Sequence, residues 1–433
     1  MFIQRAVLIL LCAATTARAY ADDGRVAAVT LLDQGVTFFQ DQGLAGALRF
    51  NYFSSSRSLD NETGFFGGTA QVKLRPVFNS GLDGKIEARL NEPDVGRDRS
   101  SSSSTLLEGY ITAHFAKADL RIGKQIVAWG RADGINPTDN LTPHDFTVLL
   151  PFEEDQRFGT VAAKLDVAVS TELMFTFFTT PFFEPAKIPQ PSSSAPPLED
   201  KPAQSLSNSE VGIKLDKTGG AFDGSLSYYR GFDLLPDLRM RGMTATGPVL
   251  TLQYNRIEVL GVDAARNFGR YGFRGEAAYV RTRDSAGRDP TLKNPYLFYV
   301  LGVDRTFLEN LNINLQFVGR SIQHFQDPEA IADPILRTLA VQNAIFANQQ
   351  DRTSQGLSSR IGNKWFNDTL EAEVLLFVNF QHTNAFIRPL LTYAFNDHTK
   401  GTFGGEYYRG PDDSPFGQLK PNRGVFAEFR YSF

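Results

Sequence analysis

The sequence has very little sulfur and no long apolar segment after its first 25 residues. It contains one cysteine, Cys12, and four methionines in 433 residues. Because Cys12 lies in an apolar run near the N-terminus, we expect a mature chain without disulfides, which excludes the small cross-linked domains found among exported proteins. A transmembrane helix needs about eighteen or more apolar residues in succession, and no such stretch follows residue 25.

An excess of charge of either sign is also absent. The chain has 44 basic and 48 acidic residues, a net charge of -4, so nothing indicates a nucleic acid partner. Phenylalanine, by contrast, occurs 36 times. Aromatic side chains are enriched in strands, so this composition favours β-structure over a helical core.

The N-terminus resembles a secretion signal. Arg5 precedes the apolar run 6–14, and the letters ARAYAD then supply small residues at the spacing of a cleavage site. We therefore expect residues 1–21 to be a signal peptide that is removed on export. Residues 22–43 are expected to form a periplasmic segment or a plug in the lumen of the domain that follows.

Period-two alternation between apolar and polar residues recurs along the chain. In the last ten residues, GVFAEFRYSF, Val425 and Phe429 point one way while Glu428 and Arg430 point the other. Segments of about ten residues with this pattern are typical of transmembrane barrel strands. The predicted strands are 44–54, 65–78, 83–91, 106–117, 119–130, 158–167, 171–181, 208–216, 220–231, 251–267, 271–283, 295–306, 310–322, 354–365, 369–380, 384–396, 400–410 and 424–433.

The connections between these segments alternate between short and long. Bacterial outer-membrane barrels have short periplasmic turns and long external loops. The sequence therefore predicts an all-β fold, a transmembrane up-and-down antiparallel β-barrel of about 18 strands over residues 44–433, in the outer membrane of a Gram-negative bacterium. A soluble β-sandwich or propeller also alternates, but a propeller needs a repeat of about 40–50 residues, and none is present.

Basic residues gather on the polar face of the early strands. A positively charged wall attracts anions into a narrow passage, so we expect an anion bias; the alternative is that these charges pair across neighbouring strands. The predicted pore-lining and selectivity residues are Arg49, Lys73, Arg75, Lys85, Arg89, Arg121, Arg274 and Arg388.

The segment 131–157 is rich in turn residues and in both signs of charge, which predicts an ordered loop. Folded into the lumen, it would act as a constriction; otherwise it would be an outer lid packed on the rim. Trp129, just before it, is expected in the aromatic belt at the membrane surface. The predicted constriction residues are Arg131, Asp133, Asp139, Glu153, Glu154 and Arg157, with Asp145 beside them.

Two stretches resemble a large family of porin-like outer-membrane barrels from proteobacteria. The first is RIGKQIVAWGRADGINPTDNLTP, with Gly-Lys-Gln at 123–125, Trp129-Gly130 and an Asn-Pro-x-Asp loop at 136–139. The second is YNRIEVLGVDAARNFGRYGFRGEAAYV, residues 254–280. The resemblance implies an outer-membrane barrel and no particular substrate.

The remaining features favour transport over catalysis. Residues 328–348 have apolar residues at helical spacing and predict a helix inserted in a loop. The five histidines lack a serine or aspartate signature beside them, so we expect no enzyme, metal or cofactor. We expect a channel for small or linear hydrophilic solutes; the alternative is a plugged barrel that binds or exports a surface polysaccharide, or anchors a partner protein. Expected partners are lipid and lipopolysaccharide, a hydrophilic solute or acidic polymer, and the barrel assembly machinery, through the strand that ends at Phe433.

Overall fold

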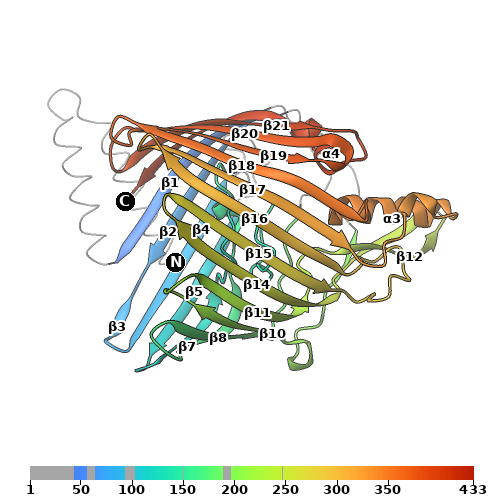
Figure 1. Ribbon diagram of the computed structural model, residues 1–433, viewed down its shortest axis with the longest axis horizontal. Helices are drawn as coiled ribbons and strands as arrows, with labels where there is room; N and C mark the ends of the chain where they lie inside the picture. The colour runs from blue at the N-terminus through green and yellow to red at the C-terminus, as the bar shows by residue number, and fades with distance from the viewer. Residues whose placement is uncertain (1–42, 56–63, 93–102, 149, 189–196, 246) are drawn as a thin grey trace.

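The fold is an antiparallel barrel with a cap of loops at one end (Figure 1). The computed structural model describes residues 43–55, 64–92, 103–148, 150–188, 197–245 and 247–433. The predicted signal peptide, 1–21, and residues 22–42 of the predicted N-terminal segment lie outside the described residues.

The main sheet contains nineteen strands that cross the barrel eighteen times, because β3 continues β2 after a break at residues 75–76. This confirms the predicted antiparallel barrel. The strands are β1 (Leu44–Ser55), β2 (Phe65–Leu74), β3 (Val77–Asn79), β4 (Leu82–Glu92), β5 (Ser103–His114), β6 (Ala118–Gln125), β7 (Thr160–Ala168), β8 (Leu173–Thr180), β10 (Glu210–Lys217), β11 (Asp223–Phe232), β14 (Arg256–Phe268), β15 (Tyr271–Arg281), β16 (Tyr296–Phe307), β17 (Leu311–Ile322), β18 (Thr353–Trp365), β19 (Leu370–Asn379), β20 (Asn384–Ala394), β21 (Thr399–Arg409) and β22 (Gly424–Ser432).

The sheet closes because its first strand pairs with its last. β1 and β22 run antiparallel in register from Ala47↔Ser432 to Ser55↔Gly424. At the end of this seam, Gly46 N–H donates to Phe433 O (2.8 Å) and Phe433 N–H donates to Gly46 O (3.0 Å). Each β-strand in the ring therefore has a partner on both sides, which leaves no unpaired edge to face lipid.

Successive side chains in each strand point to opposite sides of the wall, as predicted. In β14, Leu260 is 62 % exposed while its neighbour Val259 is 2 % exposed. In β22, Phe429 is 47 % exposed and Glu428 is 4 % exposed. The outer surface is thus apolar, whereas many buried inward residues are polar or charged. This pattern is the one that a barrel in hydrocarbon requires.

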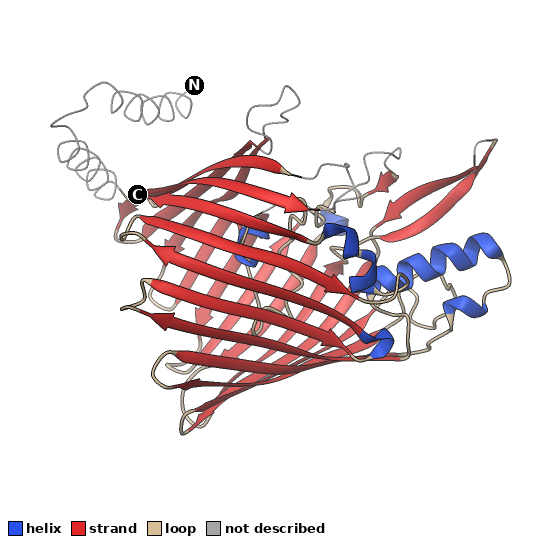
Figure 2. Ribbon diagram, turned by 90° about the horizontal axis from the view of Figure 1, so that it is seen from above, coloured by secondary structure: helices blue, strands red, loops and turns tan. Residues whose placement is uncertain are grey.

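The two ends of the barrel differ (Figure 2). At one end, which we call the turn end, strands are joined by residues 80–81, 115–117, 169–172, 218–222, 269–270, 308–310, 366–369 and 395–398. At the other, the loop end, the connections are long, except for 380–383 between β19 and β20. This alternation, with its one short exception, was predicted.

The structure corrects several predicted boundaries and adds a small sheet. β5 begins at Ser103, β6 ends at Gln125 and β14 begins at Arg256, not at 106, 130 and 251. Residues 251–253, predicted as the start of a barrel strand, belong instead to β13 (Gly247–Gln253), which forms a hairpin with β12 (Asp237–Thr244). β13 also pairs in parallel with β9 (Leu198–Asp200). This three-stranded sheet lies at the loop end, outside the ring (Figure 1).

The predicted helix within 328–348 is present as two pieces. They are η3 (Pro328–Ala330) and α3 (Pro334–Ala347). The Asp333 carboxylate caps α3 by accepting from the N–H groups of Ile335 (2.9 Å) and Leu336 (3.0 Å), and Asn348 ends it with a φ of 51°. Within the described part of the chain, no helix has the length and apolar character needed to span a membrane. The shorter helices are η1 (Glu153–Gln156), η2 (Leu206–Asn208), η4 (Gln381–Thr383), α4 (Pro415–Gln418) and η5 (Lys420–Asn422).

Candidate functional site: a loop inside the barrel

The connection between β6 and β7, residues 126–159, passes through the interior of the barrel. We call it the inner loop. Its polar groups contact inward-facing residues on opposite parts of the wall, which places them within the ring of strands. The contacts involve β1, β4, β10, β14, β15, β17, β18 and β20.

The carboxylate of Glu276, on β15, anchors the first part of the inner loop. It accepts hydrogen bonds from the backbone N–H groups of Arg131 (3.0 Å), Ala132 (3.2 Å) and Thr138 (2.7 Å), and from the Thr138 hydroxyl (2.8 Å). Gly130 passes so close that a Cβ there would lie 2.6 Å from both carboxylate oxygens, and its φ of 100° is one that glycine adopts readily. The chain can therefore approach Glu276 only because residue 130 has no side chain.

The guanidinium of Arg131 bridges two strands. It donates to the carboxylate of Asp263 on β14 and, at 2.5 Å, to that of Asp216 on β10. Asp263 and Glu276 both lie in the second stretch that resembles the porin-like family, and Arg131 follows the Trp-Gly of the first. Arg131 lies 132 positions before Asp263 and 145 before Glu276 in the chain. The two stretches are therefore two sides of one interface. Sequence reasoning identified both stretches and missed their contact.

Asp133 extends this anchorage to two further strands on the same side of the barrel. Its N–H donates to Gln316 Oε1 (2.9 Å) on β17, and its carbonyl accepts from Gln316 Nε2 (2.8 Å). Arg360 on β18 donates to its carboxylate at 3.1 Å. Residues 131–138 are thus held by ion pairs and hydrogen bonds from five strands on one side of the barrel.

An apolar cluster lies under the same part of the inner loop. Trp129 is 5 % exposed and packs inside the barrel, so its predicted place in an aromatic belt is wrong. β6 ends four residues earlier, which allows the chain to turn inward before Trp129. The inward faces of β7, β8, β11, β14 and β15 are apolar at this level, a pattern that sequence reasoning missed. The cluster contains Val127, Trp129, Leu141, Ala162, Phe178, Tyr229, Ile257, Val259, Ala278 and Val280.

The opposite side of the barrel holds residues 150–156, which we call the loop tip. Arg49 on β1 forks onto the carboxylate of Asp155 with bonds of 2.6 and 3.0 Å. Arg89 on β4 donates to the backbone carbonyl of Asp155 at 2.5 Å, and Arg388 on β20 donates to the carbonyl of Pro151. Three predicted wall arginines therefore converge on the loop tip.

The two arms of the inner loop are cross-linked near its base. Arg157 Nη1 lies 2.5 Å from Asp139 Oδ2, and Asp139 also accepts from Trp129 N–H at 3.3 Å. Burial raises the pKa of Asp139, although the Arg157 charge opposes that shift. Asp145 pairs at 2.8 Å with Lys187 of the following long connection. These contacts fix the base independently of the loop tip.

His144 is a buried titratable group at the base of the inner loop. Burial, together with the Arg157 charge, lowers the pKa of His144 from 6.5 to about 4. Between these two pKa values, His144 is protonated when the loop is released and neutral when the loop is docked. Docking therefore weakens as the pH falls. We expect amide-exchange protection of residues 141–159, corrected for intrinsic rates, to fall roughly tenfold from pH 7 to pH 5. His144→Gln should abolish this loss of protection; an equal loss in the variant would contradict the assignment.

The other predicted site residues lie outside these contacts. Lys85 pairs with Glu87 (2.7 Å) and with Glu108, and Arg274 pairs with Asp304 (3.0 Å). The remaining positions are Arg121, 4.4 Å from the centre of the Tyr110 ring; Lys73, half-buried on β2; Arg75, exposed at the break before β3; and Glu153 and Glu154, exposed in η1.

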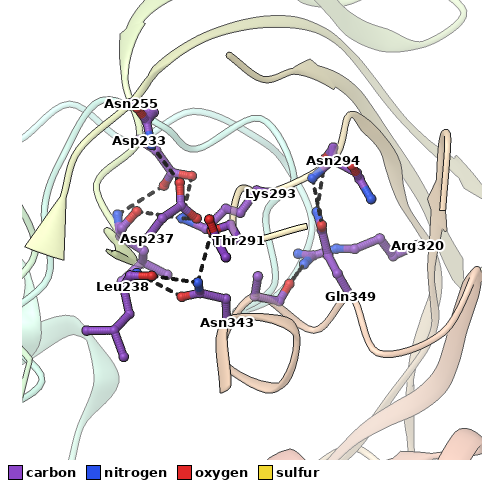
Figure 3. Close-up of polar contacts among 12 residues, drawn as sticks. Asp233, Asp237, Leu238, Asn255, Thr291, Lys293, Asn294, Arg320, Asn343 and Gln349 are labelled. Carbon is purple, nitrogen blue, oxygen red and sulfur yellow. Dashed lines mark hydrogen bonds and ion pairs between the residues drawn. The ribbon is translucent and has the colours of Figure 1, made fainter. Parts of the chain in front are cut away.

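The loop end is held by a second polar network, shown in Figure 3. Asn343 on α3 accepts from Leu238 N–H (2.8 Å) and donates to the carbonyls of Leu238 and Thr291 (both 2.9 Å). Lys293 donates to the carboxylate of Asp233 at 2.8 Å. Burial disfavours the charged form of Lys293, but Asp233 and Asp237 outweigh this effect and raise its pKa. The helix, hairpin and neighbouring connection therefore form one connected cover.

Solved structures with a similar fold are outer-membrane proteins. The outer membrane protein opdK from Pseudomonas aeruginosa matches with a TM-score of 0.55 and 8 % identity, over 90 % of this chain and 98 % of that one. OccK8 (OprE) from the same organism matches with 0.54 and 10 %, over 91 % and 98 %. OccAB4 from Acinetobacter baumannii matches with 0.53 and 11 %, over 90 % and 97 %. This chain therefore has the fold of an outer-membrane β-barrel protein.

The likeness lies in the fold and extends over nearly the whole length of each structure. No family model matches the chain, and a search of curated proteins finds no match.

Proposed function

We propose that this protein is a channel in the outer membrane of a Gram-negative bacterium that admits small or linear hydrophilic solutes. The observation that carries the proposal is the inner loop, which is bound by charged wall residues within a closed barrel whose outer face is apolar. A ring of this size is too wide for wall side chains to fill. A loop docked across it narrows the passage and lines it with charge.

An anion bias is supported by the surroundings of the loop tip. Arg49, Arg89 and Arg388 converge there, and a low-dielectric passage lined by cations concentrates anions. The support differs from residue to residue. Lys85 and Arg274 are paired with carboxylates, as the alternative of cross-strand pairing anticipated. Arg49 and Arg388 also have carboxylate partners, Asp155 and Glu406, so we assign selectivity chiefly to Arg89 and to Arg75.

The constriction is assigned to the inner loop, with Arg131, Asp133, Asp139 and Arg157 holding its shape and Glu153 and Glu154 exposed at its tip. Lipopolysaccharide, a hydrophilic solute or acidic polymer, and the barrel assembly machinery acting on the strand that ends at Phe433 remain the proposed partners. The apolar outer face and the paired β22 support the first and the last of these.

The second candidate is a non-conducting barrel that binds or exports a surface polysaccharide or anchors a partner protein. It is favoured by the extent of the docking: the inner loop is attached on opposite sides of the lumen, and an apolar cluster lies beneath it. In this case the inner loop would act as a plug.

Conductance in planar bilayers separates the two candidates. We expect discrete single-channel currents from the purified protein and larger currents after deletion of 131–157. The anion-to-cation permeability ratio should fall in Arg75→Gln/Arg89→Gln, and Arg337→Gln, an exposed position on α3, is the control. Absence of current in both the full chain and the deletion would overturn the channel, and an unchanged ratio would overturn the bias.

A further inference from the structure

The carboxylate of Asp155 occupies a site lined by buried guanidinium groups. Arg49 forks onto it at 2.6 and 3.0 Å, and Arg89 binds the backbone carbonyl of the same residue at 2.5 Å. Arg49 is 3 % exposed and Arg89 is 1 % exposed. A fork of this kind matches the oxygens of any carboxylate or phosphate, and one attached to the chain fills it here.

Several donors of the site form no hydrogen bond, although two carboxylates lie within ion-pair distance: Glu428, 3.9 Å from Arg49, and Glu406, 3.6 Å from Arg388. The Nε groups of Arg49, Arg89 and Arg388 are all buried without a hydrogen-bond partner. Among the described residues, no carboxylate lies within ion-pair distance of Arg89. A buried donor without an acceptor lacks the hydrogen bonds that water would give it, so a ligand that offers further oxygens gains interactions that Asp155 alone leaves unused.

The loop tip is attached differently from the rest of the inner loop. Residues 131–138 are fixed by Glu276 and Arg131, and the base is fixed by the Asp139–Arg157 and Asp145–Lys187 pairs. The hydrogen bonds from the strands to the described residues of the loop tip come from the three arginines. Loss of these bonds would release the loop tip without undocking the remainder.

We propose that Asp155 is a tethered competitor for an oxyanion site, and that a solute carrying a carboxylate or phosphate displaces it from Arg49 and Arg89. The loop tip then leaves the arginines and the passage widens for the solute that opened it. This inference rests on the proposed channel function. A short tether gives the competing carboxylate an effective concentration on the order of millimolar, so displacement needs solute in that range.

The test follows amide exchange of the loop tip in detergent-solubilised full-length protein, with succinate or inorganic phosphate titrated against chloride at constant ionic strength. We expect both oxyanions, and not chloride, to reduce protection of residues 150–156 while that of 131–138 is unchanged. In Asp155→Asn, protection should be low from the start. Succinate binding can be followed by the fluorescence of a dye attached beside the site. In Asp155→Asn the half-maximal change should need about tenfold less succinate than in the unmodified protein, the factor that one charge-assisted hydrogen bond contributes.

The matched control is Asp397→Asn, which removes an exposed carboxylate in the turn between β20 and β21 that has no ion pair among the described residues. It should behave like the unmodified protein. Equal responses to chloride and succinate, or equal effects of the two variants, would overturn the proposal. Current without an oxyanion-dependent change at the loop tip would overturn the displacement of Asp155 and leave the proposed channel function standing. Release of the loop tip by oxyanions without any current would overturn the channel function and leave the displacement standing.

Discussion

Replacing Arg131 with leucine should release the first arm of the inner loop. The change leaves Asp263, whose side chain is 1 % exposed, without its cationic partner. Removal of one member of a buried ion pair costs about 3–5 kcal/mol; Asp216 keeps Lys214 at 2.5 Å, so we expect the lower figure, about 3 kcal/mol. Amide-exchange protection of residues 131–139 should therefore fall by roughly 100-fold, while the barrel strands keep theirs.

Arg337→Leu provides the control, because Arg337 is an exposed arginine on α3 outside the barrel. It should leave protection of the inner loop unchanged. If Arg131→Leu also left the loop protected, the ion pairs with Asp216 and Asp263 would not be what holds it. A general loss of barrel protection would instead show that the loop supports the wall.

Alanine at position 130 should displace Glu276 and abolish the anchor that it forms. The new Cβ would lie 2.6 Å from both carboxylate oxygens, so the carboxylate must move away from the N–H groups of Arg131, Ala132 and Thr138. The change loses three or more charge-assisted bonds, and it also places alanine in a backbone conformation that disfavours it. We expect a protease-sensitive loop and single-channel currents several-fold larger and noisier than those of the unmodified protein.

Gly269→Ala separates the two causes. Gly269 also has a positive φ, 59°, but a Cβ there would meet nothing within 4 Å. It therefore measures backbone strain alone and should leave the currents unchanged. Glu276→Gln, which keeps the size of the side chain, should reproduce the effect of Gly130→Ala in part. If Gly130→Ala and Glu276→Gln both gave normal currents, this anchor would not set the width of the passage.

The barrel itself could be predicted because lipid imposes a strict pattern on each strand. A residue such as Leu260 must be apolar on the outside while Asp263 can be charged inside, so period two is visible without knowing any partner. The turn at residues 308–310 and the long connection at 323–352 could likewise be placed from strand ends alone.

The contacts of the inner loop could not be predicted in the same way. Alternation shows that Glu276 and Arg360 face inward, but it carries no information about which of many inward residues a loop will meet. Trp129 was misplaced for a related reason, since an aromatic residue at the end of a strand fits a membrane belt and a buried cluster equally well. The end of β13 was assigned to a barrel strand because residues 251–253 continue the alternation of β14, and only Tyr254 and Asn255 separate the two strands.

The pairing of β1 with β22 bears on how such a barrel is assembled. The seam joins residues 424–432 of β22 to residues 47–55 of β1, at opposite ends of the described chain. Until the two are paired, the first strand has a row of backbone amides and carbonyls with no partner, which hydrocarbon does not tolerate. The ring must therefore be closed, or be closing, when its first strand meets hydrocarbon.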